Sequence, residues 1–314
     1  MTIQIKKAQR EAVPVLVGLA GYSGSGKTFS ALLLAAGLAG EGGKIGLIDT
    51  DNKRASMYAT DPKIKAAIPQ GYDVADMTDP YTPARFLEYA RAFEAKGYDV
   101  LVIDTISHEY EGAGGMEDMA ATSKTKWLAP KMQHKKMMNG LMALNMHIIF
   151  SIRAREKVKV TEVDGKPSYE SLGIQPICEK NFMFELTLSM MLDADTNRPN
   201  IIKRPPTELF PTFNNDMGLI TKEHGARLRE WTLGGIPLDP KFEKIKAECR
   251  EAARYGNSPL DAYIKTIPVN YKAQLAPFGA EFRSIADEFD SQRINDSESE
   301  SKLLGGLNEQ IQKS

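Results

Sequence analysis

The stretch GYSGSGKT at residues 21–28 constrains this chain most, because it fits the spacing G-x-x-x-x-G-K-[ST]. An apolar run, VPVLVGLA, precedes it, and a stretch of helical composition, FSALLLAAGLAG, follows it. A strand, a tight loop and a helix in this order let backbone N–H groups and a helix N-terminus surround a phosphate. The pattern therefore predicts nucleotide binding by Gly21, Ser23, Gly24, Ser25, Gly26, Lys27, Thr28 and Phe29.

Two side chains of this loop suit a complex of ATP with Mg²⁺. Lys27 can reach the β- and γ-phosphates, and the Thr28 hydroxyl can ligate the metal ion. A carboxylate at the end of a neighbouring strand would complete the metal shell, and Asp104 ends the apolar run VLVID at residues 100–104. We therefore expect ATP and Mg²⁺ as cofactors, with Thr28 and Asp104 as the metal ligands.

The rest of the chain alternates between short apolar runs and helical stretches up to about residue 155. This alternation predicts a mostly parallel sheet that is covered on both faces. Further on, a hairpin around Asp164 and Gly165 and two more apolar runs predict strands that extend the sheet in the antiparallel sense. The predicted apolar runs are 13–20, 44–51, 100–104, 147–152, 182–192 and 199–204, and the helical stretches are 29–40, 86–97 and 117–145.

The composition shifts near residue 236. From residue 239 onward the chain reads as helical, and it ends in the polar, low-complexity stretch SQRINDSESES and its continuation. We therefore predict an α/β P-loop core over residues 1–235, a C-terminal helical segment over 236–290 and a flexible tail over 291–314.

Hydrolysis also needs a group that orients the attacking water, and a carboxylate can accept its hydrogen bond. Glu109 lies five residues past Asp104 in VIDTISHEYEG, and Asp51 ends the run LIDTD. We favour Glu109 and keep Asp51 as the alternative. His108 and Glu111 are expected to lie on a solvated loop face.

The order GYSGSGKT, LIDTD, VLVIDTISHE and HIIFSIRAREK resembles the RecA-like ATPase core. It is most similar to the phage-encoded AAA-type proteins that include the Sak-group single-strand annealing ATPases, over residues 3–232. The resemblance implies a RecA-like ATPase acting in DNA recombination, annealing or replication in the cytoplasm of a bacterial host. It also nominates Asp51 to activate water and Ser151 to sense the γ-phosphate.

Several cations follow the last strands of the predicted core. Arg153, Arg155 and Lys157 alternate after HIIFSI. The pair Lys203 and Arg204 resembles the K-x-R element through which RecA-like subunits reach a neighbour's γ-phosphate, with a contracted spacing. A cation acting across an interface would imply self-association into a ring or filament, and a solvated strand end is the alternative.

A partner of nucleic-acid type is indicated only locally, because the chain carries 40 Lys and Arg against 41 Asp and Glu, a net charge of −1. The stretch SKTKWLAPKMQHKKMM joins lysines with one tryptophan, as single-stranded DNA binding requires. The alternative is a helix with solvated lysines and with four apolar residues in the core, namely Trp127, Leu128, Met132 and Met138. A partner protein of replication or recombination is a further expectation.

Two other functions remain open from the sequence. A small-molecule or nucleoside kinase also begins with a phosphate loop, and a nucleotide-switched binding protein would bind ATP with little turnover. The two cysteines, Cys178 and Cys249, lack metal-ligand spacing. No stretch approaches the roughly 20 apolar residues that span a bilayer, so no membrane partner is expected.

Overall fold

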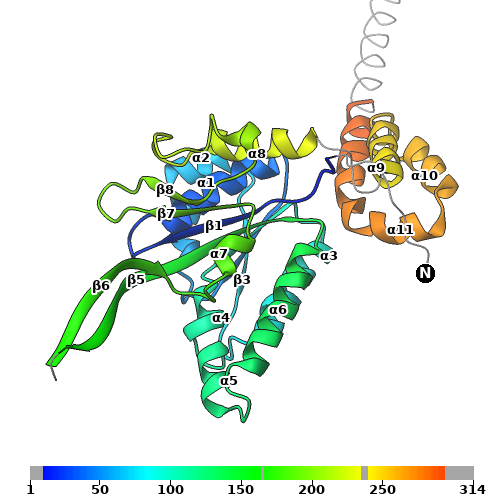
Figure 1. Ribbon diagram of the computed structural model, residues 1–314. Helices are drawn as coiled ribbons and strands as arrows, with labels where there is room; N and C mark the ends of the chain where they lie inside the picture. Colours follow the sequence, from blue (N-terminus) through cyan, green and yellow to red (C-terminus); the bar gives the residue numbers. More distant parts are fainter. Residues whose placement is uncertain (1–9, 164–165, 235–239, 294–314) are drawn as a thin grey trace, which may run out of the picture. The chain divides into compact units, whose positions relative to one another are not determined.

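The computed structural model describes residues 10–163, 166–234 and 240–293 (Figure 1). The chain divides into two compact units, Met1–Ile236 and Pro237–Ser314, and each is described by itself. The predicted boundary between residues 235 and 236 lies outside the described residues, as do the turn at 164–165 and the predicted tail from 294 onward.

The first unit is built on one twisted sheet with the strand order β3-β2-β4-β5-β1-β7-β8. The neighbours from β3 to β7 pair in parallel, whereas β8 pairs with β7 and β6 with β5 in the antiparallel sense. The strands are β1 (Leu16–Gly21), β2 (Ile45–Asp49), β3 (Asp73–Asp76), β4 (Val100–Asp104), β5 (His147–Val163), β6 (Lys166–Pro176), β7 (Leu188–Leu192) and β8 (Pro199–Lys203).

Helices cover both faces of this sheet (Figure 1). Along β1, Val17 and Leu19 enter the core beneath α1 and α8, while Leu16 and Ala20 enter the core beneath α3 and α6, as the period of two in a strand requires. The helices of this unit are α1 (Lys27–Ala39), η1 (Ala55–Thr60), α2 (Pro62–Ala67), α3 (Pro83–Ala95), α4 (Ser107–Glu111), α5 (Met116–Thr122), α6 (Leu128–Met142), α7 (Phe182–Glu185), η2 (Thr207–Leu209) and α8 (Lys222–Leu233).

The predicted α/β fold, with a mostly parallel sheet extended by antiparallel strands and with C-terminal helices, is confirmed. Because every residue of β1, β2 and β4 is buried, these strands read as continuous apolar runs rather than as alternating ones. In Figure 1 the β5–β6 hairpin extends away from the rest of the sheet.

Two predicted elements are wrong in detail. The helical stretch over 117–145 is interrupted at residues 123–127, where Lys126 adopts a φ of 48° that a helix does not accommodate. The apolar run 182–192 begins with the short helix α7 before it becomes β7. Phe182 turns there into the core and meets Phe150 edge-on, with ring centroids 5.1 Å apart.

The second unit is helical in the residues described. Its core gathers Phe242, Ile245, Cys249, Leu260 and Phe282. Its helices are α9 (Pro240–Ala253), α10 (Asn257–Thr266), α11 (Val269–Leu275), η3 (Ala276–Phe278) and a further helix over 279–293. Within the described parts of both units, no helix is both long and apolar enough to cross a bilayer.

Candidate nucleotide-binding site

The glycine-rich loop connects β1 directly to α1, which begins at Lys27. Gly24 and Gly26 have φ values of 86° and 78°, in the left-handed region that glycine adopts without strain. The Ser25 hydroxyl and the Lys27 ammonium both donate hydrogen bonds to the Tyr22 carbonyl, at 2.9 and 2.6 Å. The loop is therefore curled on itself in front of a helix N-terminus, which is the arrangement that binds phosphate.

A cavity of about 1090 Å³ opens beside this loop, at the edge where the parallel strands end. Open α/β sheets bind their ligands at this edge, outside the carboxyl ends of the strands. The cavity is lined by Tyr22, Ser23, Gly24, Gly26, Lys27, Thr28, Asp51, Arg54, Met57, Tyr58, Thr60, Asp61, Pro62, Asp104, Thr105, Glu111, Ser151, Arg153, Ala154, Arg155 and Ile177. Among the residues predicted to bind the nucleotide, Gly21, Ser25 and Phe29 do not line it; Phe29 packs against the core and faces Tyr58.

Thr28 and Asp104 meet in this cavity although β1 and β4 are not neighbouring strands. The Thr28 hydroxyl donates a 2.6 Å hydrogen bond to Asp104 Oδ2. A hydroxyl and a carboxylate fit Mg²⁺, which typically takes one or two protein oxygens and completes its shell with water and substrate phosphates. No group of three or more His, Cys, Asp or Glu suited to a metal ion occurs among the described residues.

The Lys27 ammonium is mostly buried next to this pair. Burial lowers the pKa of Lys27 below its usual 10.5, and the carboxylate of Asp104 offsets the effect only in part, with Arg153 acting in the same direction as burial. A buried cation whose donors reach only a loop carbonyl is short of anionic partners. An oxyanion in the cavity would supply them.

The two acids at the end of β2 have different roles in the structure. Asp49 is buried, and its two carboxylate oxygens accept N–H groups of Asp51 at 2.7 Å and Ala55 at 2.9 Å. Burial raises the pKa of Asp49, although these two hydrogen bonds oppose the shift. Asp49 thus fixes the following turn, and that turn places the Asp51 carboxylate in the cavity.

Arg153 and Arg54 hold the Asp51 carboxylate from two sides. Arg153 Nη2 lies 2.6 Å from Asp51 Oδ1, and Arg54 Nη1 lies 3.8 Å from Oδ2. The backbone N–H of Arg153 donates to the Ser107 hydroxyl at 2.8 Å, which ties β5 to α4. Arg155 also lines the cavity and pairs with Glu111 at 3.4 Å.

Ser151 lies on β5 between the phosphate-loop strand and the strand of Asp104. It pairs in register with Leu19 of β1 and with Asp104 of β4. Its side chain is fully buried, and its hydroxyl has no hydrogen-bond partner among the described residues. A buried hydroxyl without a partner costs about 1–3 kcal/mol, and its place in the cavity lining allows a ligand bound there to supply one.

Glu109 is absent from the cavity lining and is turned away from Asp104 into the protein. It is 2% exposed, and its Oε1 lies 3.1 Å from Nδ1 of His134 in α6. Its neighbours are half-buried rather than solvated as predicted: His108 Nδ1 lies 2.8 Å from the Thr50 hydroxyl, and Glu111 lines the cavity. Asp51 therefore reaches the nucleotide cavity, whereas Glu109 does not.

Lys203 and Arg204 do not come near the phosphate loop of the same chain. Lys203 pairs with Ser189 of β7, which pairs with Gly18 of β1, three residues before the loop begins. The Lys203 ammonium donates to the Phe184 carbonyl at 2.7 Å, and the Arg204 guanidinium lies over the Phe210 ring.

Several lining residues were not identified from the sequence, among them Arg54, Met57 and Tyr58. Arg54 flanks Asp51, and Met57 and Tyr58 form an apolar wall from the short helix η1. The arginine three residues past LIDTD was a readable signal for Arg54. Met57 and Tyr58 had no such signal in the sequence, because no motif marks η1.

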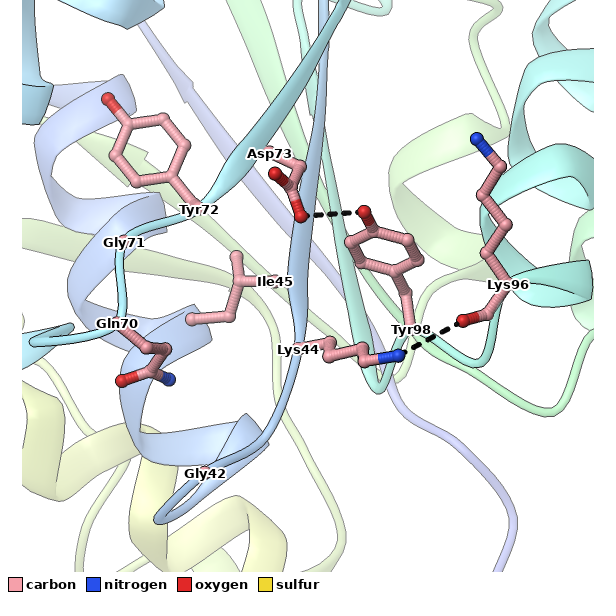
Figure 2. Close-up of a pocket in the computed structure, with 9 residues that line it drawn as sticks. All are labelled: Gly42, Lys44, Ile45, Gln70, Gly71, Tyr72, Asp73, Lys96 and Tyr98. Carbon is pink, nitrogen blue, oxygen red and sulfur yellow. Dashed lines mark hydrogen bonds between the residues drawn. The ribbon is translucent and has the colours of Figure 1, made fainter. Parts of the chain in front are cut away.

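A second hollow, of about 540 Å³, lies at the opposite edge of the sheet, where β2 and β3 begin (Figure 2). The Tyr98 hydroxyl donates to Asp73 at 2.6 Å, and burial together with this hydrogen bond raises the pKa of Tyr98 to about 12. Lys44 and Lys96 lie at its rim, joined by a bond from the Lys44 ammonium to the Lys96 carbonyl. Its position away from the loop separates it from the nucleotide cavity.

The fold and the phosphate loop together define a P-loop nucleotide-binding protein. A family model described as an AAA domain matches residues 14–199, which is more than half of the chain, and the chain belongs to that family. The match spans β1, the loop, the strand of Asp104 and the start of β8.

Two individual proteins are similar to parts of the chain. The signal recognition particle 54 kDa protein of Thermococcus gammatolerans is 29% identical over 123 residues, 35% of this chain and 25% of that protein. The chain thus spans about a quarter of the length of that relative. A crystal structure of the RadB recombinase matches with 16% identity and a TM-score of 0.35, over 58% of this chain and 75% of the other.

Proposed function

We propose that this chain is an ATPase that hydrolyses ATP in the presence of Mg²⁺. The observation that carries the proposal is the contact between Thr28 and Asp104, 2.6 Å apart, inside a cavity that also contains the buried ammonium of Lys27. Mg²⁺ held there would neutralise charge on the phosphates. The curled loop and Lys27 would bind and orient the β- and γ-phosphates, which removes much of the entropic barrier to in-line attack.

Asp51 is the better placed of the two candidate acids to orient the attacking water. Its carboxylate lines the cavity, whereas Glu109 is buried against His134 outside the lining. Asp51 Oδ1 accepts a hydrogen bond from Arg153, whereas Oδ2 lies 3.8 Å from Arg54, beyond hydrogen-bond distance, and can accept one from water. We therefore assign the orientation of the attacking water to Asp51. Glu109, through its bond to His134, positions α4 against α6.

Ser151 and Arg153 would respond to the γ-phosphate from the same strand. The unpartnered hydroxyl of Ser151 can donate to an oxyanion, and the guanidinium of Arg153 can stabilise charge that develops on the transferred group. Both lie on β5, which continues directly into the β5–β6 hairpin.

The biological setting we propose is DNA recombination, single-strand annealing or replication of phage type, with single-stranded DNA as partner and with self-association into a ring or filament. The support is the order of the sequence motifs and the lysine-rich segment before and within α6. Lys203 and Arg204, which lie away from the loop of their own chain, are the proposed cations for a neighbouring subunit.

Phosphate release from Mg²⁺-ATP, measured with and without oligo(dT), tests this function. Hydrolysis that single-stranded DNA stimulates and that Asp104→Asn removes is the expected result. Transfer of the γ-phosphate to a small acceptor would instead identify a kinase. Tight binding of a fluorescent ATP analogue without turnover would identify a nucleotide-switched binding protein.

A further inference from the structure

The segment that enters α6 presents lysines and apolar side chains together on the protein surface. Trp127, Leu128 and Met132 are 38%, 62% and 65% exposed, so the predicted placement of these three in the core is wrong, and only Met138 of that set is buried. All five lysines of the segment are exposed as well. We call this surface the lysine face; it comprises Lys124, Lys126, Trp127, Leu128, Lys131, Met132, Lys135 and Lys136.

The geometry of α6 explains this division. The buried face carries residues at helical spacing, Pro130, His134, Met137, Met138 and Leu141. Leu128, Met132, Lys135 and Lys136 fall on the opposite side of the same helix, and Lys131 lies on its flank. Apolar side chains on that side gain nothing from the core of this chain.

The charge of the lysine face is not neutralised internally. None of its five lysines forms an ion pair with a carboxylate in the parts of the chain that the structure describes. The whole chain is close to neutral, so this concentration of positive charge is local. A polyanion is the ligand that such a surface attracts.

Trp127 distinguishes between kinds of polyanion. Its indole stacks on the Tyr110 ring, with centroids 5.9 Å apart and planes 20° from parallel, and stays partly exposed. A preoriented aromatic ring beside lysines and the apolar Leu128 and Met132 suits unpaired bases, which stack on aromatic side chains while lysines contact their phosphates. Paired bases in a duplex offer no such faces.

We infer that the lysine face is the surface on which this chain binds single-stranded DNA. The inference rests on the proposed function for its partner and adds the surface that holds it. Helix α4 joins this surface to the nucleotide cavity: Tyr110 stacks on Trp127, Glu109 bonds to His134 in α6, and Ser107 accepts the backbone N–H of Arg153. Single-stranded DNA on the lysine face would thus lie against α4, the helix that follows Asp104.

Fluorescence anisotropy of oligo(dT) binding across a salt series tests the inference. The oligonucleotide is about 20 nucleotides long, which exceeds the roughly 4–16 nucleotides that one stacking groove covers. Lys131→Gln/Lys135→Gln should lower affinity about tenfold and reduce the salt slope by about 1.4, or 0.7 for each lost phosphate contact. The matched control is Lys44→Gln/Lys96→Gln, which removes the same charge at the opposite edge of the sheet (Figure 2) and should change neither quantity.

Tryptophan fluorescence supplies a second readout, because the chain has only two tryptophans, Trp127 and Trp231. In the Trp231→Phe variant, oligo(dT) should quench the remaining fluorescence of Trp127. In the Trp127→Phe variant, Trp231 should report no quenching. Trp127→Ala should weaken binding about tenfold.

Three results would overturn the inference. They are unchanged oligo(dT) binding by the double lysine variant, equal affinity for a duplex of the same length, and binding of an acidic protein to this surface by a chain that does not bind oligo(dT). ATP hydrolysis without DNA is measured on the same preparations. A wild type that hydrolyses ATP but does not bind oligo(dT) defeats this inference alone, whereas absent hydrolysis defeats the proposed ATPase and leaves the DNA result interpretable.

Discussion

Arg153 Nη2 lies 2.6 Å from Asp51 Oδ1 inside the nucleotide cavity, and this ion pair joins the turn after β2 to the middle of β5, two strands that are separated by β4. Both partners are partly exposed, so the pair itself contributes little to stability. Its value is positional, because it fixes a carboxylate and a guanidinium side by side in the space beside the phosphate loop. A γ-phosphate there would compete with Asp51 for Arg153.

The assignment of Asp51 leads to a comparison of two isosteric variants. Asp51→Asn should retain ATP binding and lower kcat by about 10²- to 10³-fold, because an amide orients water less well than a carboxylate and cannot accept its proton. Glu109→Gln should retain most of the turnover, because its carboxylate does not line the cavity. Phosphate release and binding of a fluorescent ATP analogue measure both effects. Loss of turnover in Glu109→Gln alone would return the role to Glu109.

Lys27→Ala tests the phosphate loop itself. The side chain is mostly buried and, within the described residues, bonds only to the Tyr22 carbonyl, so its removal leaves a small polar cost in the protein without nucleotide. We expect hydrolysis to fall by at least about 10³-fold, since the variant loses the cation that meets the β- and γ-phosphates. Lys44→Ala, which removes an exposed lysine from the opposite edge of the sheet, is the control and should hydrolyse ATP normally. Equal activity of the two variants would refute the assignment.

The strands and the phosphate loop could be predicted because their signals are local. VLVID is buried on both faces, so its apolar run is unbroken and its last residue, Asp104, emerges at the edge of the sheet. The glycines of the loop occur where the backbone needs positive φ, at Gly24 and Gly26. Each of these features is decided by fewer than ten consecutive residues.

The surroundings of Glu109 and Trp127 could not be predicted because they depend on residues distant in sequence. Glu109 is buried only because α6 brings His134, 25 positions away, against α4. Trp127 is exposed because the helix behind it buries the face that carries His134 and Met138 instead. A composition of lysines mixed with apolar residues is compatible with either outcome until the packed face of the helix is known.

Ser151→Ala separates a functional hydroxyl from a structural one. Because this buried hydroxyl has no partner in the described residues, its removal should leave the free energy of unfolding unchanged or raise it by about 1 kcal/mol. If Ser151 contacts the γ-phosphate, the same variant should lower kcat by about 10²-fold. Urea unfolding and phosphate release provide the two measurements. Lower stability with normal turnover would show that the hydroxyl serves the fold.

The buried pair of Glu109 and His134 predicts how stability depends on pH. Burial alone would lower the pKa of His134, but the hydrogen bond and charge of Glu109, with Glu179 and Glu185, raise it above its usual 6.5. Burial also raises the pKa of Glu109, and His134 offsets this only in part. Both groups therefore hold a proton more tightly in the folded chain, so their contribution to stability is complete at low pH and is lost as pH rises through the folded pKa of His134.

The free energy of unfolding should accordingly fall as the pH rises from the usual histidine pKa of 6.5 through the raised folded pKa of His134. The other three histidines have lowered pKa values, so their contributions change below this window. His134→Gln, which keeps a hydrogen-bond donor without the titration, should remove the fall, whereas His224→Gln should retain it. His134→Ala should cost about 3 kcal/mol at pH 7, because it leaves the Glu109 carboxylate buried without a partner. Urea unfolding at a series of pH values from 6.5 upward measures all three variants, and an unaltered slope in His134→Gln would rule out the pair as its source.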